Sequence, residues 1–147
     1  MTTEILTGAE LRDLKALVAE MIPASTAYCV PGADDEAIFA DIVNSLERDT
    51  EDARASLRLL GELSGGSFAA LDAARRRDVA ATFKAKGGPA LFALNRVVLL
   101  CYYRDDRVML SLGQEPRAPF PKGHVVEQGD WSLLDPVKKR APFWRRT

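Results

Sequence analysis

The chain has 147 residues, of which 47% are hydrophobic and 28% charged, and its formal net charge is −1. One domain of this size can bury a substantial core, and its near-neutral charge gives no reason to expect a nucleic-acid or membrane partner. Cys29 and Cys101 lack metal-ligand spacing and are expected to be free thiols, with a disulfide as an open alternative. The N-terminus carries no export signal, which predicts a cytoplasmic protein unless a leader was removed.

The first helix is predicted from Thr7 to Ile22. Thr7 and Glu10 have the spacing of a capping box, and Pro23 disfavours helical backbone at Ile22. Apolar side chains then recur at helical spacing: Leu11, Leu14, Val18 and Met21. The following loop has two prolines, and we expect it to pack on the body through Tyr28, Cys29 and Val30.

Three more helices are expected between about residue 34 and Lys86. One runs from about residue 34 to residue 48, with acidic residues in its first turn, where the helix dipole favours them. The next begins with Thr50 as its cap and frays at the glycine-rich residues 61–67. A single turn over residues 68–71 precedes a helix capped by Asp72 that reaches about Lys86, with Arg75–Arg77 facing outward.

Residues 89–103 are almost continuously apolar and begin with a proline, which is favoured at the first helical position. A helix that is apolar on nearly all faces is expected to lie buried in the middle of a bundle. Asp105 or Asp106 can then cap a short helix that stops at Gly113. No run alternates with a period of two, so the predicted fold is all-α, a five- to six-helix bundle over residues 1–113.

Residues 114–147 form a long, irregular tail that is rich in proline and aromatic residues and is predicted to be an extended arm on the domain or on a partner subunit. It contains five of the eight prolines and both tryptophans. Disordered tails are poor in large apolar residues, so this one is expected to bury them against a surface. The predicted anchors for a partner are Phe120, Pro121, Trp131, Phe143 and Trp144, together with Tyr102 and Tyr103 near the end of the apolar helix.

Charge is divided unevenly along the chain. Residues 1–73 hold 5 Lys and Arg against 14 Asp and Glu, whereas residues 74–147 hold 15 against 7. The default expectation is that the two halves pair with each other, and the alternative is an acidic partner for the second half.

Side chains that carry catalytic chemistry are scarce. His124 is the only histidine, and no cysteines or clustered carboxylates surround it in the sequence. The glycine-rich residues 61–67 lack the Gly-Lys-Ser/Thr ending of a phosphate loop. Two short basic clusters, Arg75–Arg77 and Lys138–Arg140, are better explained as solvated surface. The residues therefore predict no catalytic, cofactor or metal site on this chain.

Several short blocks follow one another in a characteristic order: Leu14–Pro23, Pro31–Ala33, Phe39 with Asp41, Phe68 with Leu71, Phe92–Arg96, Tyr102-Tyr103, Leu112-Gly113 and Pro119–Gly123. In this order and spacing the chain resembles the gluconate 2-dehydrogenase subunit 3 family, the small subunits of flavin-dependent sugar and alcohol dehydrogenases. It differs from the family at Cys101, where glycine is common, at Gln114, where tyrosine is common, and in having no twin-arginine leader.

The resemblance implies a non-catalytic accessory subunit with a chaperone-like, stabilising role. Its partner would be a large flavoprotein of the glucose-methanol-choline type, in a hetero-oligomer that oxidises a sugar, glycoside or alcohol. FAD and the catalytic residues would belong to that other chain. The complex would be cytoplasmic, or periplasmic if a leader was removed or is supplied by the partner.

Two other functions remain as alternatives. One is a stand-alone enzyme or small-ligand-binding protein with a pocket beside Arg96, Tyr102, Tyr103 and His124. The other is a nucleic-acid-binding protein that uses the basic residues 138–146 and binds in a salt-dependent way.

Overall fold

The computed structural model describes residues 6–118, 120, 122–123 and 125–141, and it separates into two compact units, Met1–Pro116 and Arg117–Thr147. The regular elements described in the first unit are all helices, as predicted. Its elements are α1 (Gly8–Met21), α2 (Glu36–Ser45), η1 (Glu47–Asp49), α3 (Thr50–Ser64), η2 (Phe68–Ala70), α4 (Ala73–Lys86), α5 (Gly88–Tyr103) and α6 (Asp106–Ser111). Apart from a single bridge between Ser25 and Val30, the described residues pair in no sheet.

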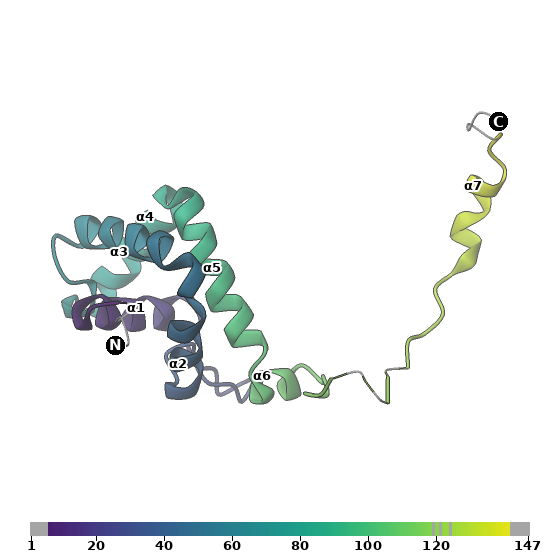
Figure 1. The fold of residues 1–147 in the computed structure, drawn as a ribbon, viewed down its shortest axis with the longest axis horizontal. Coiled ribbons are helices and arrows are strands. Elements are labelled where there is room, and N and C mark those ends of the chain that lie inside the picture. The colour runs from purple at the N-terminus through teal and green to yellow at the C-terminus, as the bar shows by residue number, and fades with distance from the viewer. Residues whose placement is uncertain (1–5, 119, 121, 124, 142–147) are drawn as a thin grey trace. The chain divides into compact units, whose positions relative to one another are not determined.

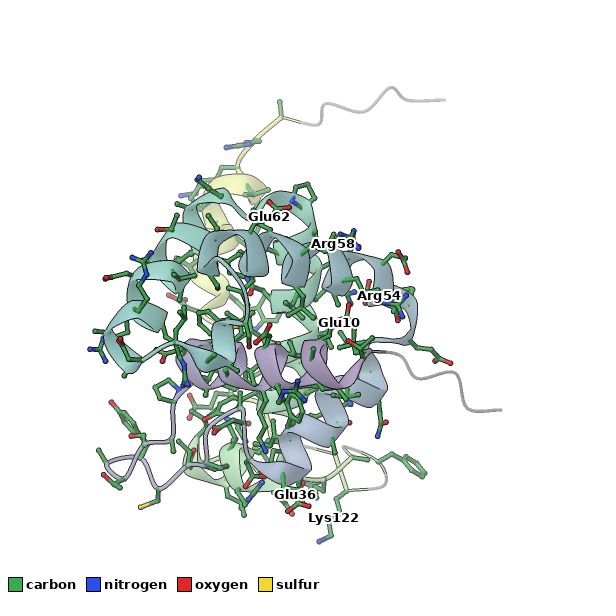
Figure 2. All side chains as sticks on the ribbon, turned by 90° about the vertical axis from the view of Figure 1, so that its left-hand side faces the viewer. Glu10, Glu36, Arg54, Arg58, Glu62 and Lys122 are labelled. Carbon is green, nitrogen blue, oxygen red and sulfur yellow. The ribbon has the colours of Figure 1, made fainter. Side chains whose placement is uncertain are left out.

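The predicted capping box starts α1. The Thr7 hydroxyl accepts a hydrogen bond from the Glu10 backbone N–H, and the Glu10 carboxylate accepts one from the Thr7 N–H at 2.7 Å. This hydrogen bond from the Thr7 backbone holds the pKa of Glu10 below its usual value, and Arg54 and Arg58 of α3 lower it further. Figure 2 shows Glu10 on the side of α1 that faces these arginines. The helix ends at Met21 with Ile22 as its C-cap, next to Pro23, within one residue of the expected end.

The loop after α1 corrects one prediction. Backbone hydrogen bonds of 3.0 Å in both directions between Ser25 and Val30 close a tight turn. Because Tyr28 and Cys29 occupy the tip of this turn, they point away from the body: Tyr28 is 76% exposed and Cys29 is also exposed. Only Val30 of the three expected residues is partly buried.

The second and third helices begin and end at slightly different residues from those expected. Asp35 caps α2 through its carboxylate, which accepts from the N–H groups of Ala37 and Ile38. The helix then stops at Ser45, and the turn η1 leads into α3. Thr50 is the first residue of α3 rather than its cap, and its hydroxyl donates back to the carbonyls of Leu46 and Glu47. A threonine can satisfy the preceding turn in this way as readily as it can cap the next.

Two further predicted caps are confirmed. Asp72 caps α4 and Asp105 caps α6. Between α4 and α5 the chain turns at Gly88, which has a φ of +59°, a conformation that favours glycine. Gly113, at a φ of +71°, ends the segment after α6.

The core of the first unit lies between α5 and the helices on one side of it. α5 packs against α2 and α3, and α3 also packs against α4. Figure 1 shows α5 running along the edge of the bundle, with the other long helices on the same side. The fully buried large side chains are Leu14, Leu17, Val18, Ile38, Ile42, Leu46, Leu60, Phe68, Leu94, Val98, Cys101 and Val108.

This arrangement corrects the expectation that α5 is buried all round. A helix at the edge of a bundle is covered on one side only, and the opposite side of α5 keeps apolar side chains exposed, among them Phe92 at 72% and Leu100 at 56%.

The second unit contains the short turn η3 (Trp131–Leu134) and the one-turn helix α7 (Asp135–Lys138). Asp130 caps η3 through its carboxylate, which accepts from the Ser132 N–H at 3.0 Å. Neither element buries a residue. The predicted boundary fell between residues 113 and 114, whereas the units separate between Pro116 and Arg117.

Asp13 of α1 holds the turn η2 in place. One of its carboxylate oxygens accepts hydrogen bonds from the Ser67 hydroxyl at 2.7 Å and from the Ala69 N–H at 2.9 Å. The Ala69 carbonyl in turn accepts a hydrogen bond from the Arg76 guanidinium at 2.7 Å. Arg76 was expected to face outward, and this contact shows that it turns back onto η2.

Replacing Asp13 by Ala should therefore lower the free energy of unfolding by about 1–3 kcal/mol, since it leaves the Ala69 N–H without its acceptor. Asp13→Asn keeps an acceptor oxygen and should retain most of the stability. Urea unfolding followed by circular dichroism measures both. Equal losses in the two variants would show that these hydrogen bonds contribute little.

Three ion pairs join the acidic first half of the chain to the basic second half, which confirms the default expectation. Arg96 of α5 contacts Asp49 at 2.6 Å, and Arg107 of α6 contacts Asp35 at 2.7 Å. Arg104 forms the third with Asp41, through its Nε at 2.6 Å.

The pairs of Arg107 with Asp35 and Asp105 predict a sensitivity to acid. Hydrogen bonds from Arg107 hold the pKa values of Asp35 and Asp105 below their usual 3.8. Because the folded-state pKa is lower than the unfolded one, the pairs stabilise the fold above about pH 4, and this contribution is lost as the pH falls through the lowered values. Arg107→Gln should lower the Tm at neutral pH and shrink the further drop in Tm on acidification. Thermal unfolding at about pH 7 and about pH 3 tests this, and an unchanged acid drop would contradict it.

Candidate docking surface

The two tyrosines at the end of α5 have different surroundings. Tyr102 is 4% exposed, and its hydroxyl donates to the Pro31 carbonyl at 3.1 Å. Tyr103 is 53% exposed and packs edge-on against Tyr102, with ring centroids 5.3 Å apart. Of this predicted pair, Tyr103 is accessible to a partner, while Tyr102 ties α5 to the loop after α1.

The other predicted anchors lie in the second unit or outside the described residues. Phe120 is 86% exposed and Trp131 is 64% exposed, with its indole N–H donating to the Gln128 side chain at 3.2 Å. Pro121, Phe143 and Trp144 lie outside the described residues, as does His124.

The structure brings together two of the residues named for the alternative pocket, Arg96 and Tyr103, which line one groove on the outer side of α5. Arg96 is engaged with Asp49 and lines two shallow grooves, neither of which includes Tyr102. Tyr103 lines one of these two grooves. His124, which also belongs to the predicted pocket, lies outside the described part of the chain.

An exposed apolar stripe runs along the outer side of α5. It consists of Phe92, Leu99, Leu100 and Tyr103, which are 72%, 44%, 56% and 53% exposed. Their spacing of seven, eight and eleven residues from Phe92 places them on one side of a helix. Together they expose roughly 450 Å², taking about 200 Å² for each large side chain. Apolar patches of this size on single proteins often mark a binding site.

An apolar groove continues this stripe between α1, α4 and α5. Its volume is about 420 Å³. The apolar lining comes from Leu17, Met21, Ile22, Ala80, Ala81, Phe83, Leu91 and Leu99, with Glu20, Lys84 and Asn95 as its polar members. Since Leu99 and Asn95 also line the shallow groove on the outer side of α5, the two apolar surfaces are continuous.

Sequence reasoning missed Phe92, Leu99, Leu100 and this groove. The usable signal was that the apolar residues of 91–103 fall on two sides of one helix. Leu94, Val98 and Cys101 make one side, and Phe92, Leu99 and Tyr103 make the other. A chain of this length has few helices with which to cover both sides of α5, so one side was to be expected at the surface.

In the described part of the chain, the cysteines and acidic groups form no reactive cluster. Both cysteines are free thiols, and burial raises the pKa of Cys101, which keeps it protonated. Within residues 6–118 and the described parts of the tail, no three His, Cys, Asp or Glu side chains are grouped to hold a metal ion. No helix in the same residues is long and apolar enough to cross a bilayer. No protein-family model, curated protein or solved structure matches this chain.

Proposed function

We propose that this chain is a non-catalytic small subunit that docks on a larger flavin-dependent oxidoreductase. The observation that carries the docking role is the exposed apolar stripe on α5, formed by side chains that a free soluble protein would normally cover. The family resemblance of the sequence supplies the class of partner, a flavoprotein that oxidises a sugar, glycoside or alcohol. FAD and the reacting groups belong to that partner.

The amount of exposed apolar surface supports two attachment points. A stable interface buries about 800 Å² on each partner, and the α5 stripe alone offers roughly half of that. The second unit exposes further large side chains: Phe120, Val125, Val126, Trp131, Leu133, Leu134 and Val137. At the same about 200 Å² for each large side chain they add roughly 1,000 Å², so the two surfaces together exceed what a stable complex requires.

Trp131→Ala in the full-length chain tests the contribution of the second unit. The exposed Trp131 ring is expected to fill a pocket on the partner, so its removal should weaken the complex by about 2 kcal/mol or more, roughly thirtyfold in Kd. The helical content should not change, because the ring buries little within the chain. Co-purification of the flavoprotein, together with circular dichroism of the isolated variant, measures both.

Lys122→Ala is the matched control, since it removes an exposed side chain of the same unit with little apolar surface. The flavoprotein should remain bound to this control. A complex that is equally stable with Trp131→Ala, Lys122→Ala and the unaltered chain would contradict the role of the second unit.

A further inference from the structure

In the first unit, most basic side chains of residues 74–116 fall into two groups, while Arg76 is bound to the Ala69 carbonyl. From α5 to α6, Arg96, Arg104 and Arg107 are all paired with carboxylates of the first half. On α4, by contrast, four exposed side chains have no ion pair with any described residue: Arg75, Arg77, Lys84 and Lys86. Within the first unit, the basic side chains of the second half that have no carboxylate partner therefore lie on α4.

One side of α4 combines this charge with the apolar groove. Arg77, Ala80, Ala81 and Lys84 are spaced i, i+3, i+4 and i+7, so they share a face of the helix. Ala80, Ala81 and Lys84 line the groove, next to the buried Phe83, whereas the carboxylate in the lining, Glu20, belongs to α1. The two alanines leave room for another backbone to approach, and the basic residues lie one at each end of that face.

We propose that the groove between α1, α4 and α5 binds an amphipathic helix of the partner protein, with its apolar side in the groove and acidic residues against Arg77 and Lys84. This inference rests on the proposed docking function and adds the kind of element that is recognised. Helix-in-groove binding uses apolar anchors at helical spacing, and complementary charge fixes the orientation.

The shape of the surface favours a helix over a small molecule. Small-ligand sites enclose most of their ligand, whereas this groove is open and runs on into the exposed stripe. From Phe92 to Tyr103 the stripe is about 16 Å long at 1.5 Å per residue, the length of three helical turns.

A second copy of the chain is a poor occupant. The exposed apolar helix that it would offer is α5, which contains no acidic residue and one arginine. The carboxylates of Asp35, Asp41 and Asp49 are already engaged by arginines of their own chain. An acidic helix from a different protein satisfies both the apolar groove and the unpaired charge of α4.

The test uses two synthetic amphipathic peptides of about 18 residues, or five helical turns, with the same leucine stripe. One carries glutamate beside the stripe, and the other carries lysine at the same positions. Fluorescence anisotropy should show that the full-length chain binds the glutamate peptide at least tenfold more tightly at low salt, with the difference shrinking as salt is added.

Three variants locate the site. Lys84→Glu should abolish the preference for the glutamate peptide, while Lys86→Glu, an exposed neighbour outside the groove, should keep it. Leu99→Gln should weaken binding of both peptides at least tenfold, and circular dichroism confirms that each variant is folded. Equal affinity for the two peptides, no binding of either, or equal effects of Lys84→Glu and Lys86→Glu would overturn the proposal.

These outcomes separate the groove from the proposed function. A flavoprotein that binds the Lys84→Glu and unaltered chains equally well would refute the groove and leave the docking function intact. A chain that shows the peptide preference but binds no flavoprotein would refute the proposed function and leave the groove as an acidic-helix site.

Discussion

Phe68→Ala is expected to lower the free energy of unfolding by about 3–5 kcal/mol, because Phe68 is the largest of the fully buried side chains among the described residues. It lies on η2, a turn that packs against α1 and α3. Removing the ring leaves a cavity that the hydrogen-bonded turn cannot easily fill, because the Asp13 carboxylate fixes its backbone. A domain of ordinary stability, about 5–15 kcal/mol, would lose a large part of it.

Urea unfolding followed by circular dichroism measures this loss. Phe92→Ala provides the matched control, since it removes the same ring from a position that is 72% exposed, and it should change stability by no more than about 0.5 kcal/mol. Similar effects of the two substitutions would show that Phe68 does not occupy the core as described.

The second large effect concerns binding. In the full-length chain, the double variant Phe92→Asp with Leu100→Asp should abolish the complex with the flavoprotein while leaving the isolated chain folded. Both side chains are more than half exposed, at 72% and 56%, so charge is tolerated there in the free subunit. In the complex two carboxylates would be buried against an apolar surface, and at about 2 kcal/mol for each anchor the Kd should rise by roughly a thousandfold.

Tyr28→Asp is the control for this variant, because Tyr28 is 76% exposed on the loop after α1 and lines neither apolar groove. Co-purified flavin and the thermal unfolding of each isolated chain give the two measurements. If Tyr28→Asp and the α5 variant lose the flavoprotein equally, the α5 stripe has no special part in docking.

Local chemistry made most of the helix starts predictable. Thr7 with Glu10, Asp72 and Asp105 each satisfy the free N–H groups of a first turn with a side chain close in sequence, which requires no knowledge of the fold. The prediction that Thr50 caps α3 was wrong. Its hydroxyl can either cap α3 or donate to the carbonyls of Leu46 and Glu47, and the turn η1 places those carbonyls within reach.

The exposed surface could not be predicted in the same way. Tyr28 and Cys29 belong to an apolar segment, yet the backbone pairing of Ser25 with Val30 turns them outward. In α5 the apolar residues surround the helix, so periodicity cannot say which side faces the core. That choice depends on how α2 and α3 pack, and it makes Phe92 and Leu100 surface residues while Leu94 and Val98 are buried.

Purification of the unaltered full-length chain from the cells that produce it tests the docking proposal most directly. The visible absorbance of the eluate and its native mass are recorded together. Docking on a flavoprotein predicts a yellow complex that contains this chain, one larger polypeptide and stoichiometric FAD. A colourless chain that elutes alone at its own mass of 16.1 kDa would contradict the proposal.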